Sequence, residues 1–225
     1  MKLGRFECHE YVIPVAGRQI RVLGPACPDD LLDDPDIEAR FRRDEYLPYW
    51  AVPWISAVVL AEHVLTLDPP PAEPMLEIGA GLGLLSVALG ASGRTIVSSD
   101  YDPDALLFIA MNASRNGAAT VSAAALDWRT EPPGRFATIL AADVMYDQRH
   151  LEPLARFLTR ALAPGGRAYL ADPSRRAAGG FPAALADARL TFTVHTVHGV
   201  TLPALDPSDA RPVDVQIFAV RAAPD

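Results

Sequence analysis

The chain has 225 residues, half of them hydrophobic, which is enough for one substantial core and a small appendage. Its formal net charge of −8 argues against a nucleic-acid substrate, because proteins that bind nucleic acids normally present a basic face. The two cysteines, Cys8 and Cys27, match no metal-ligand spacing, and the sequence shows neither a signal peptide nor an apolar run of membrane-spanning length. We therefore expect a cytoplasmic protein with free thiols, no metal and no membrane partner.

The first 45 residues predict an extension that precedes the main domain. Two strand-like runs within residues 9–23 flank Ala16-Gly17-Arg18, a pattern typical of a β-hairpin. Residues 29–36 are acidic and interrupted by prolines, which favours a loop over a cluster of functional acids. We therefore divide the chain into a hairpin and linker extension, residues 1–45, and a main domain, residues 46–225.

An aromatic and proline cluster, residues 46–54, comes directly before a predicted helix. Pro53 suits the first turn of that helix, and the three prolines at 69–71 prevent it from continuing far past Leu67. Trp50 and Trp54 are open to two interpretations: they pack in the core, or they form a wall of a cofactor or substrate pocket.

The most informative stretch of the sequence is a glycine-rich loop. A short apolar strand, residues 75–78, ends in three alternating glycines, Gly79, Gly81 and Gly83, and residues 84–91 are apolar and helix-forming. Glycine tolerates a positive φ and, without a Cβ, lets backbone amides approach a ligand closely. The loop thus opens onto a helix N-terminus, an arrangement that suits a nucleotide.

A second short strand, residues 95–99, ends in Asp100. This carboxylate follows the first glycine by roughly 20 residues, which is where nucleotide-binding α/β units place the acid that binds the ribose. The spacing G-x-G-x-G leaves Leu84 where the dinucleotide fingerprint requires a third small residue. This departure counts against an NAD oxidoreductase, which we retain as an alternative.

Strands and helices alternate through the rest of the chain. Asp102-Pro103 starts a helix that Asn116-Gly117 ends. Further elements are expected as strands at residues 121–126, 136–142 and 167–171, as helices at residues 151–162 and 181–188, and as a closing antiparallel pair at residues 190–197 and 213–220. The alternation predicts an α/β fold with a largely parallel sheet covered by helices on both faces.

Four carboxylates accompany the ends of successive predicted strands. Glu77 lies just before the first glycine, and Asp100, Asp127 and Asp143 each follow a strand directly. Ligands of open α/β sheets bind at the carboxyl ends of the strands, so these acids indicate a shared pocket.

The residues Leu76-Glu77-Ile78-Gly79-Ala80-Gly81-Leu82-Gly83 resemble motif I of class I S-adenosylmethionine (AdoMet) methyltransferases. Residues 48–54, 143–147 and 172–175 resemble methyltransferase family 16, and within it the electron transfer flavoprotein β-subunit lysine methyltransferase group, whose bacterial relatives are often labelled nicotinamide N-methylase-like. The resemblance covers roughly residues 46–220. It implies a Rossmann-like, seven-stranded, mostly parallel sheet with an antiparallel final hairpin.

Two segments depart from the family pattern. Val144-Met145 stand where the family run has methionine and phenylalanine, and Ser174 replaces a glycine. Both lie beside the expected substrate, so they bear on the methyl acceptor rather than on the cofactor.

The resemblance and the chemistry of AdoMet together imply how the cofactor is held. Gly79 and Gly81 would let the backbone pass beside the methionine moiety, and Asp100 would accept from both ribose hydroxyls. Asp127 would accept from the adenine amino group while Trp128 or Tyr101 packs on the ring. The full set of expected cofactor residues is Trp50, Glu77, Gly79, Gly81, Asp100, Tyr101, Asp127, Trp128 and Asp143.

The run 143–147 is the predicted catalytic segment. Methyl transfer is an in-line displacement at a sulfonium carbon, so positioning and desolvation supply much of the catalysis. A lysine nucleophile must first lose its proton, and acid and phenol groups nearby can orient the neutral amine. Asp143 and Tyr146 are the predicted pair, with Asp147 in reserve. The alternative is that a strand-end aspartate only caps the following turn.

The functional hypothesis is therefore AdoMet-dependent N-methylation of lysine side chains in a protein substrate. A small-molecule amine or nicotinamide-type N-methyltransferase is the alternative of the same class. A non-catalytic AdoMet-binding interaction module is the alternative of another class, and it would need its defect between residues 143 and 147. The sequence does not identify the methyl acceptor.

Overall fold

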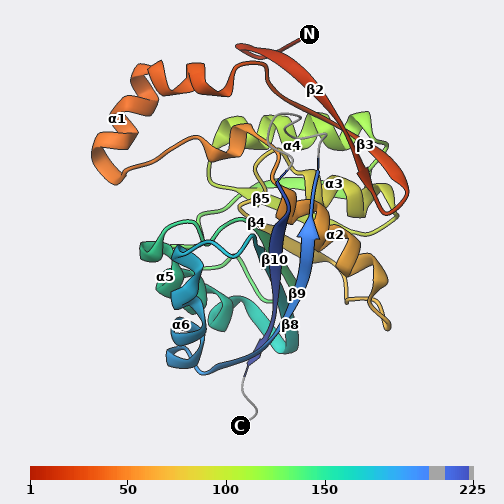
Figure 1. Ribbon diagram of the computed structural model, residues 1–225, viewed down its shortest axis with the longest axis vertical. Helices are drawn as coiled ribbons and strands as arrows, with labels where there is room; N and C mark the ends of the chain where they lie inside the picture. The colour runs from red at the N-terminus through yellow and green to blue at the C-terminus, as the bar shows by residue number, and fades with distance from the viewer. Residues whose placement is uncertain (203–210, 223–225) are drawn as a thin grey trace.

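A seven-stranded sheet forms the centre of the protein (Figure 1) in a computed structural model that describes residues 1–202 and 211–222. The strands lie in the order β6-β5-β4-β7-β8-β10-β9. The first five in this order pair in parallel, and β10 is antiparallel to both β8 and β9. Their bounds are β4 (Met75–Ile78), β5 (Ile96–Asp100), β6 (Val121–Ala125), β7 (Phe136–Ala142), β8 (Leu162–Asp172), β9 (Leu190–Val200) and β10 (Val213–Ala222). The predicted α/β fold with its closing antiparallel pair is confirmed; the loop between that pair lies largely outside the described residues.

Helices cover both faces of this sheet. On one face lie α2 (Ile55–Thr66), α3 (Leu84–Ala91) and α4 (Pro103–Arg115), and on the other α5 (Gln148–Ala161) and α6 (Phe181–Asp187). Each face has its own apolar cluster, the first including Phe108 and the second including Phe157. All four residues of β4 are buried, as expected for a central strand covered from both sides. Within the described ranges, no helix combines the length and apolarity needed to cross a bilayer.

The N-terminal extension forms a second, three-stranded antiparallel sheet of β1 (Lys2–Leu3), β2 (Phe6–Val15) and β3 (Arg18–Pro25). Ala16 and Gly17 connect β2 to β3 and both have positive φ, 48° and 77°. A two-residue turn with positive φ at both positions matches the twist of the flanking strands. The predicted hairpin is confirmed, and it lies across α4 (Figure 1).

The extension and the main domain share one core. Ile13, Val15, Ile20 and Val22 are almost completely buried and belong to the same apolar cluster as Phe108 of α4. Because the two parts pack in one core, the division of the chain at residue 45 stays a prediction.

The expectation of a loop over residues 29–36 is wrong. The structure has a 3₁₀ helix, η1 (Pro28–Asp33), followed by α1 (Pro35–Asp44). Both prolines stand in first turns, where the missing N–H costs no hydrogen bond. Asp34 caps α1 by accepting from the Asp36 N–H at 2.9 Å. The prolines and acids that suggested a loop are thus helix-starting signals.

Several further boundaries differ from the sequence prediction, including the start of α5 at Gln148 rather than at residue 151. Strand β8 begins at Leu162 rather than at residue 167, because Leu162 already pairs with Phe136 of β7. Helix α2 begins at Ile55 with Trp54 as its N-cap, so Pro53 lies just outside the helix.

A buried asparagine joins the hairpin to the main sheet. The Asn112 side chain in α4 accepts from the Leu23 N–H at 2.8 Å and donates to the carbonyls of Leu23 and Leu82 at 3.0 and 2.9 Å. We expect Asn112→Ala to lower the free energy of unfolding by about 2–4 kcal/mol, because three buried backbone groups lose their partner at on the order of 1 kcal/mol or more each. Chemical denaturation measures the change.

Asn116, one turn after Asn112 and the C-cap of α4, supplies the matched control. It makes the same kind of pair with the backbone N–H and carbonyl of Arg21, but at a position that water reaches. Asn116→Ala is expected to cost about 1 kcal/mol or less, since water can replace the lost bonds. Equal losses in the two variants would contradict the special role of Asn112.

Candidate active site

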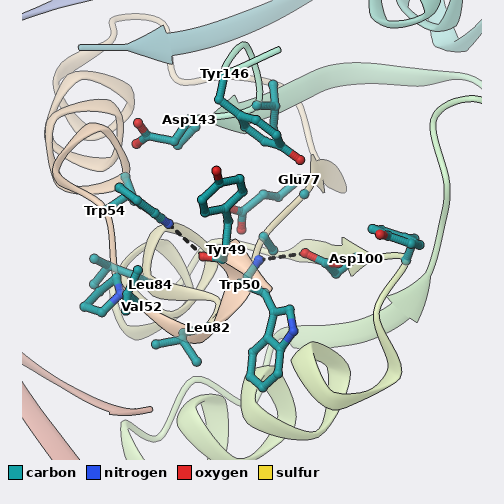
Figure 2. Close-up of a pocket in the computed structure, with 18 of the residues that line it drawn as sticks. Tyr49, Trp50, Val52, Trp54, Glu77, Leu82, Leu84, Asp100, Asp143 and Tyr146 are labelled. Atoms are coloured by element: carbon teal, nitrogen blue, oxygen red, sulfur yellow. Dashed lines mark hydrogen bonds between the residues drawn. The ribbon is translucent and has the colours of Figure 1, made fainter. Parts of the chain in front are cut away.

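A pocket of about 720 Å³, partly open to solvent, lies at the carboxyl ends of β4, β5 and β7 (Figure 2). Glu77, Asp100 and Asp143 all line it, so three of the four strand-end acids come together as expected. A second pocket of about 490 Å³ adjoins it and contains the fourth acid, Asp127. The two pockets share five lining residues, Tyr46, Leu47, Tyr101, Trp128 and Tyr146.

The glycine loop forms the floor of the first pocket. Gly79, Gly81 and Gly83 all have positive φ, between 55° and 78°, and Gly83 is the N-cap of α3. A Cβ at position 79 would come within 2.8 Å of the Val144 side chain and 3.0 Å of the Trp128 ring. Glycine is therefore required at position 79 both for backbone conformation and for space.

Glu77 binds the first turn of α3 from below the loop. Its Oε2 accepts from the backbone N–H of Ser86 at 3.1 Å and from the Ser86 hydroxyl, and the Ser98 hydroxyl lies 3.4 Å away. Burial raises the pKa of this carboxyl to about 8 despite those donors, so it holds its proton at neutral pH.

The raised pKa of Glu77 predicts how stability depends on pH. In the unfolded chain the proton leaves near pH 4.5, whereas the folded protein keeps it until about pH 8. The folded state therefore binds more protons across that window, and its stability falls as pH rises from about 4.5 to about 8. We expect Glu77→Gln to flatten this loss in denaturation curves measured between pH 5 and pH 8.

Burial also raises the pKa of Asp100, to about 6. The free energy of unfolding of the Glu77→Gln variant should therefore still fall somewhat as pH rises. Identical pH profiles for the wild type and Glu77→Gln would contradict the buried, protonated state of Glu77.

Asp100 closes the loop from the end of β5. Its Oδ2 accepts from the Gly81 N–H at 2.9 Å and its Oδ1 accepts from the Asp102 N–H at 3.0 Å. Figure 2 shows its carboxylate pointing toward the glycine loop. Each oxygen of an ionised carboxylate accepts about two hydrogen bonds, so capacity for a ligand hydroxyl remains on both.

The second pocket carries an aromatic and charged lining. Arg129 donates to both oxygens of Asp127 at 2.8–3.0 Å and also through its backbone N–H at 2.9 Å. Burial raises the pKa of Asp127, but these hydrogen bonds hold it below its ordinary value. The Arg129 guanidinium also lies 5.3 Å from the ring centre of Tyr101. A ligand amino group at Asp127 would thus share the carboxylate with Arg129.

Asp143 stands at the end of β7 in the left-handed region, with φ 59°, and its N–H donates to the Ala171 carbonyl at 2.9 Å. Its Oδ1 accepts from Arg175 Nη1, and the same nitrogen donates to Asp172 Oδ2 at 3.0 Å. Its Oδ2 is buried and has no hydrogen-bond partner among the described residues. Burial raises the pKa of Asp143 above its ordinary value, while the charge of Arg175 opposes that rise. One carboxylate oxygen is thus fixed by the guanidinium, and the other is unpaired but shielded from solvent.

Aromatic side chains form the outer wall of the first pocket, from the segment before α2 and the segment after β7. Tyr49 and Tyr146 meet edge to face with ring centres 4.9 Å apart and are 41% and 37% exposed. The Trp54 indole donates to the Tyr49 carbonyl at 2.9 Å (Figure 2). Burial raises the pKa of Tyr146, so its phenol stays protonated at neutral pH.

Two predicted site residues occupy different surroundings from those expected. The backbone of Trp50 lies against Gly81, but its indole packs in the core with ring centres 5.8 Å from Phe6 and 5.5 Å from Phe108. Asp147 caps α5 by accepting from the Arg149 N–H at 2.8 Å and pairs with the Arg149 guanidinium, and it lines only the second pocket. This geometry favours a core role for the Trp50 ring and a capping role for Asp147.

Two contributors to the site, Tyr49 and Arg175, were not expected from the sequence. Tyr49 appeared only as part of an aromatic cluster, and Arg175 only as part of a family-like run. The pairing of Arg175 with Asp143 links two segments 32 residues apart, so only the parallel pairing of β7 with β8 makes it visible. In the portion of the chain that is described, no three His, Cys, Asp or Glu residues gather in a way that could hold a metal ion.

Comparisons with known proteins point to methyltransferases. A family model described as lysine methyltransferase matches residues 50–180. The electron transfer flavoprotein beta subunit lysine methyltransferase of Rattus norvegicus is 29% identical over 131 residues, covering 57% of this chain and 51% of the relative. The ribosomal protein L11 methyltransferase of Citrifermentans bemidjiense is 36% identical over 94 residues, covering 41% of this chain and 30% of the relative. The chain thus aligns with about half the length of the flavoprotein relative.

Solved structures share the fold. The N-methyltransferase NodS from Bradyrhizobium japonicum WM9, in complex with S-adenosyl-L-homocysteine, superposes with a TM-score of 0.56 and 21% identity, covering 73% of this chain and 86% of that chain.

Proposed function

Because this chain belongs to the lysine methyltransferase family, family 16 of the class I AdoMet-dependent methyltransferases, we propose that it transfers a methyl group from AdoMet to a lysine side chain of a protein substrate. The observation that carries the proposal is the shared pocket. Residues of the glycine loop, Asp100 and Asp143 all line one cavity, and Asp143 Oδ2 is buried without a hydrogen-bond partner among the described residues. The flavoprotein relative suggests a substrate similar to the electron transfer flavoprotein β subunit.

The residues present fit AdoMet. The positive-φ glycines leave a cradle that a Cβ would fill, and Asp100 retains acceptor capacity for two ribose hydroxyls. The adjoining pocket offers Asp127 and the Trp128 ring to adenine, and the Trp128 Nε1–H is buried without a partner among the described residues.

AdoMet, when bound, supplies an electrophilic methyl group on a sulfonium. We assign the acceptor side to the chain's own groups: Asp143 Oδ2 would accept a hydrogen bond from the amine, and the Tyr146 phenol would complete its orientation. A lysine amine has an ordinary pKa of about 10.4 and must lose its proton to attack. Desolvation in the narrow pocket lowers that pKa, which favours the neutral nucleophile.

The exposed aromatic wall supports a side-chain acceptor. Tyr49 and Trp54 with Tyr146 offer flat apolar faces to a four-carbon stem, while the nitrogen reaches the acid behind them. A small amine or pyridine would use the same acid but would need less of this wall, so it remains the second candidate.

Labelling with tritiated AdoMet tests the proposal. The protein is added to a lysate from a strain that lacks its gene, and labelled species are identified by mass spectrometry. We expect label on a lysine of one or a few proteins, and none without the added enzyme. Label confined to small molecules would support the amine or nicotinamide-type alternative. Calorimetric AdoMet binding without any label transfer would support the non-catalytic module.

A further inference from the structure

We propose that Arg175 is a positioning residue of this enzyme: its ion pair keeps the Asp143 carboxylate ionised and oriented, with Oδ2 left to receive the acceptor amine. The inference rests on the proposed function of the pocket. It adds a role for a residue that lies outside the glycine loop and outside the 143–147 run.

The geometry of Arg175 is fixed at both ends. Its backbone N–H donates to Asp172 Oδ1 at 2.7 Å, and its Nη1 bridges Asp172 Oδ2 and Asp143 Oδ1. Asp172 and Asp143 are almost completely buried, with side-chain exposures of 0% and 4%. The preceding Ser174 has φ 58° and donates from its hydroxyl to the Asp214 carbonyl at 3.1 Å. One guanidinium thus joins the ends of β7 and β8.

The charge of Arg175 opposes the effect of burial on the pKa of Asp143. Burial is the largest influence on this carboxyl and raises its pKa, and the guanidinium is the largest influence that lowers it. Asp172, from the end of β8, raises the pKa by a smaller amount. Ser56, from α2, lowers it although its hydroxyl makes no hydrogen bond of ordinary geometry.

The other titratable groups that line the same pocket are the acids Glu77 and Asp100 and four tyrosines, Tyr46, Tyr49, Tyr101 and Tyr146. None of these is cationic, so Arg175 is the positive charge that opposes burial. Protonation of Asp143 would remove the negative charge from the carboxyl whose Oδ2 is proposed to accept a hydrogen bond from the amine.

Arginine suits this place better than lysine would. Its Nη1 bonds both carboxylates, and the planar guanidinium still presents a face to an aromatic ring, which an ammonium group does not. The carbon of the guanidinium lies 5.4 Å from the ring centre of Trp54, which belongs to the acceptor wall. The same side chain therefore holds the acid and supports the wall that faces it.

The test compares Arg175→Met with Arg175→Lys and with Arg176→Met. Arg176 is the next residue, is exposed, and forms no ion pair within the described part of the chain. The first readout is the pKa of the Asp143 carboxyl, from ¹³C NMR of protein labelled at aspartate carboxyls and assigned with Asp143→Asn. The second is the pH profile of label transfer to lysate protein, and the third is the AdoMet dissociation constant from calorimetry.

We expect Arg175→Met to raise the pKa of Asp143 by at least about one unit, which is about a tenfold change in its ionisation constant. The acidic limb of the rate profile should move upward by the same amount, with the AdoMet dissociation constant within about twofold of the wild type. Arg175→Lys should restore most of the profile because it keeps a positive charge, and Arg176→Met should match the wild type.

An unmoved carboxyl pKa in folded Arg175→Met, or a uniform loss of rate at every pH, overturns the inference. If Arg175→Met does not fold, the pKa of the Asp143 carboxyl is measured in the double variant Asp172→Asn/Arg175→Met. This variant leaves one buried carboxylate unpaired instead of two. A wild-type protein that transfers no label contradicts the proposed function, and the carboxyl titration then decides by itself whether Arg175 keeps Asp143 ionised.

Discussion

Replacement of Asp143 by asparagine is expected to lower the rate of methyl transfer by at least about tenfold, and by up to about 10⁴-fold, while AdoMet binding stays nearly unchanged. The buried Oδ2 of Asp143 has no partner among the described residues, and its Oδ1 is held by Arg175. Asparagine keeps the shape but loses the charge that attracts an amine N–H. Calorimetry for AdoMet and the initial rate of label transfer are measured on the same preparation.

Asp187→Asn, at the exposed end of α6, is the isosteric control and should change neither quantity. Equal loss of binding and rate in Asp143→Asn would move Asp143 to the cofactor side of the pocket. No loss in either would leave it as a cap of the turn after β7. Tyr146→Phe should follow Asp143→Asn with a smaller loss of rate, since the phenol contributes one hydrogen bond.

Asp100→Ala is expected to weaken AdoMet binding by about 1.5–3 kcal/mol, or about 10–150-fold, the range for hydrogen bonds to a charged group. The carboxylate would serve the ribose and also holds the Gly81 N–H at 2.9 Å, so its loss removes ligand contacts and loosens the loop together. Asp100→Asn keeps one acceptor oxygen and should lose less. Titration calorimetry with AdoMet and with NADH measures both affinity and selectivity.

Asp104→Ala serves as the control, because that carboxylate lies in the first turn of α4 and pairs with Arg5 outside the pocket. An unchanged dissociation constant in Asp100→Ala would show that the ribose binds elsewhere. Micromolar NADH binding without any AdoMet heat would contradict the cofactor assignment itself.

Local signals predicted most of the fold. The bounds of α3 and β7 and the caps of α4 agree with the sequence prediction, since glycine, Asp-Pro and Asn-Gly act through backbone geometry close to them. Helix α1 was missed because only Ile37 among its residues is buried, so its apolar periodicity is weak. The start of β8 was missed because Leu162 pairs with Phe136 of β7 ahead of an irregular stretch, which contains Pro164 and Gly165, before the regular pairing resumes at Arg167.

The sequence predicted which acids line the pocket, but it did not predict which side chains pair with them. Glu77, Asp100 and Asp143 were placed in one pocket by their positions at strand ends. The engagement of Asp127 with Arg129 and of Asp143 with Arg175 depends on side-chain direction, which strand order alone does not determine. Their proposed roles stay predictions until the variants above are measured.

The three hydrogen bonds of Asn112 have a consequence for exchanging segments between related enzymes. Its amide is bound to the hairpin at Leu23 and to the glycine loop at Leu82, so the loop takes its position partly from residues that precede the main domain. A chimera that joins the extension of one relative to the main domain of another will keep the loop in place only when β3 presents a backbone N–H and carbonyl at the position of Leu23. Preserving that register matters more to a working hybrid than preserving the side chains of the hairpin's exposed face.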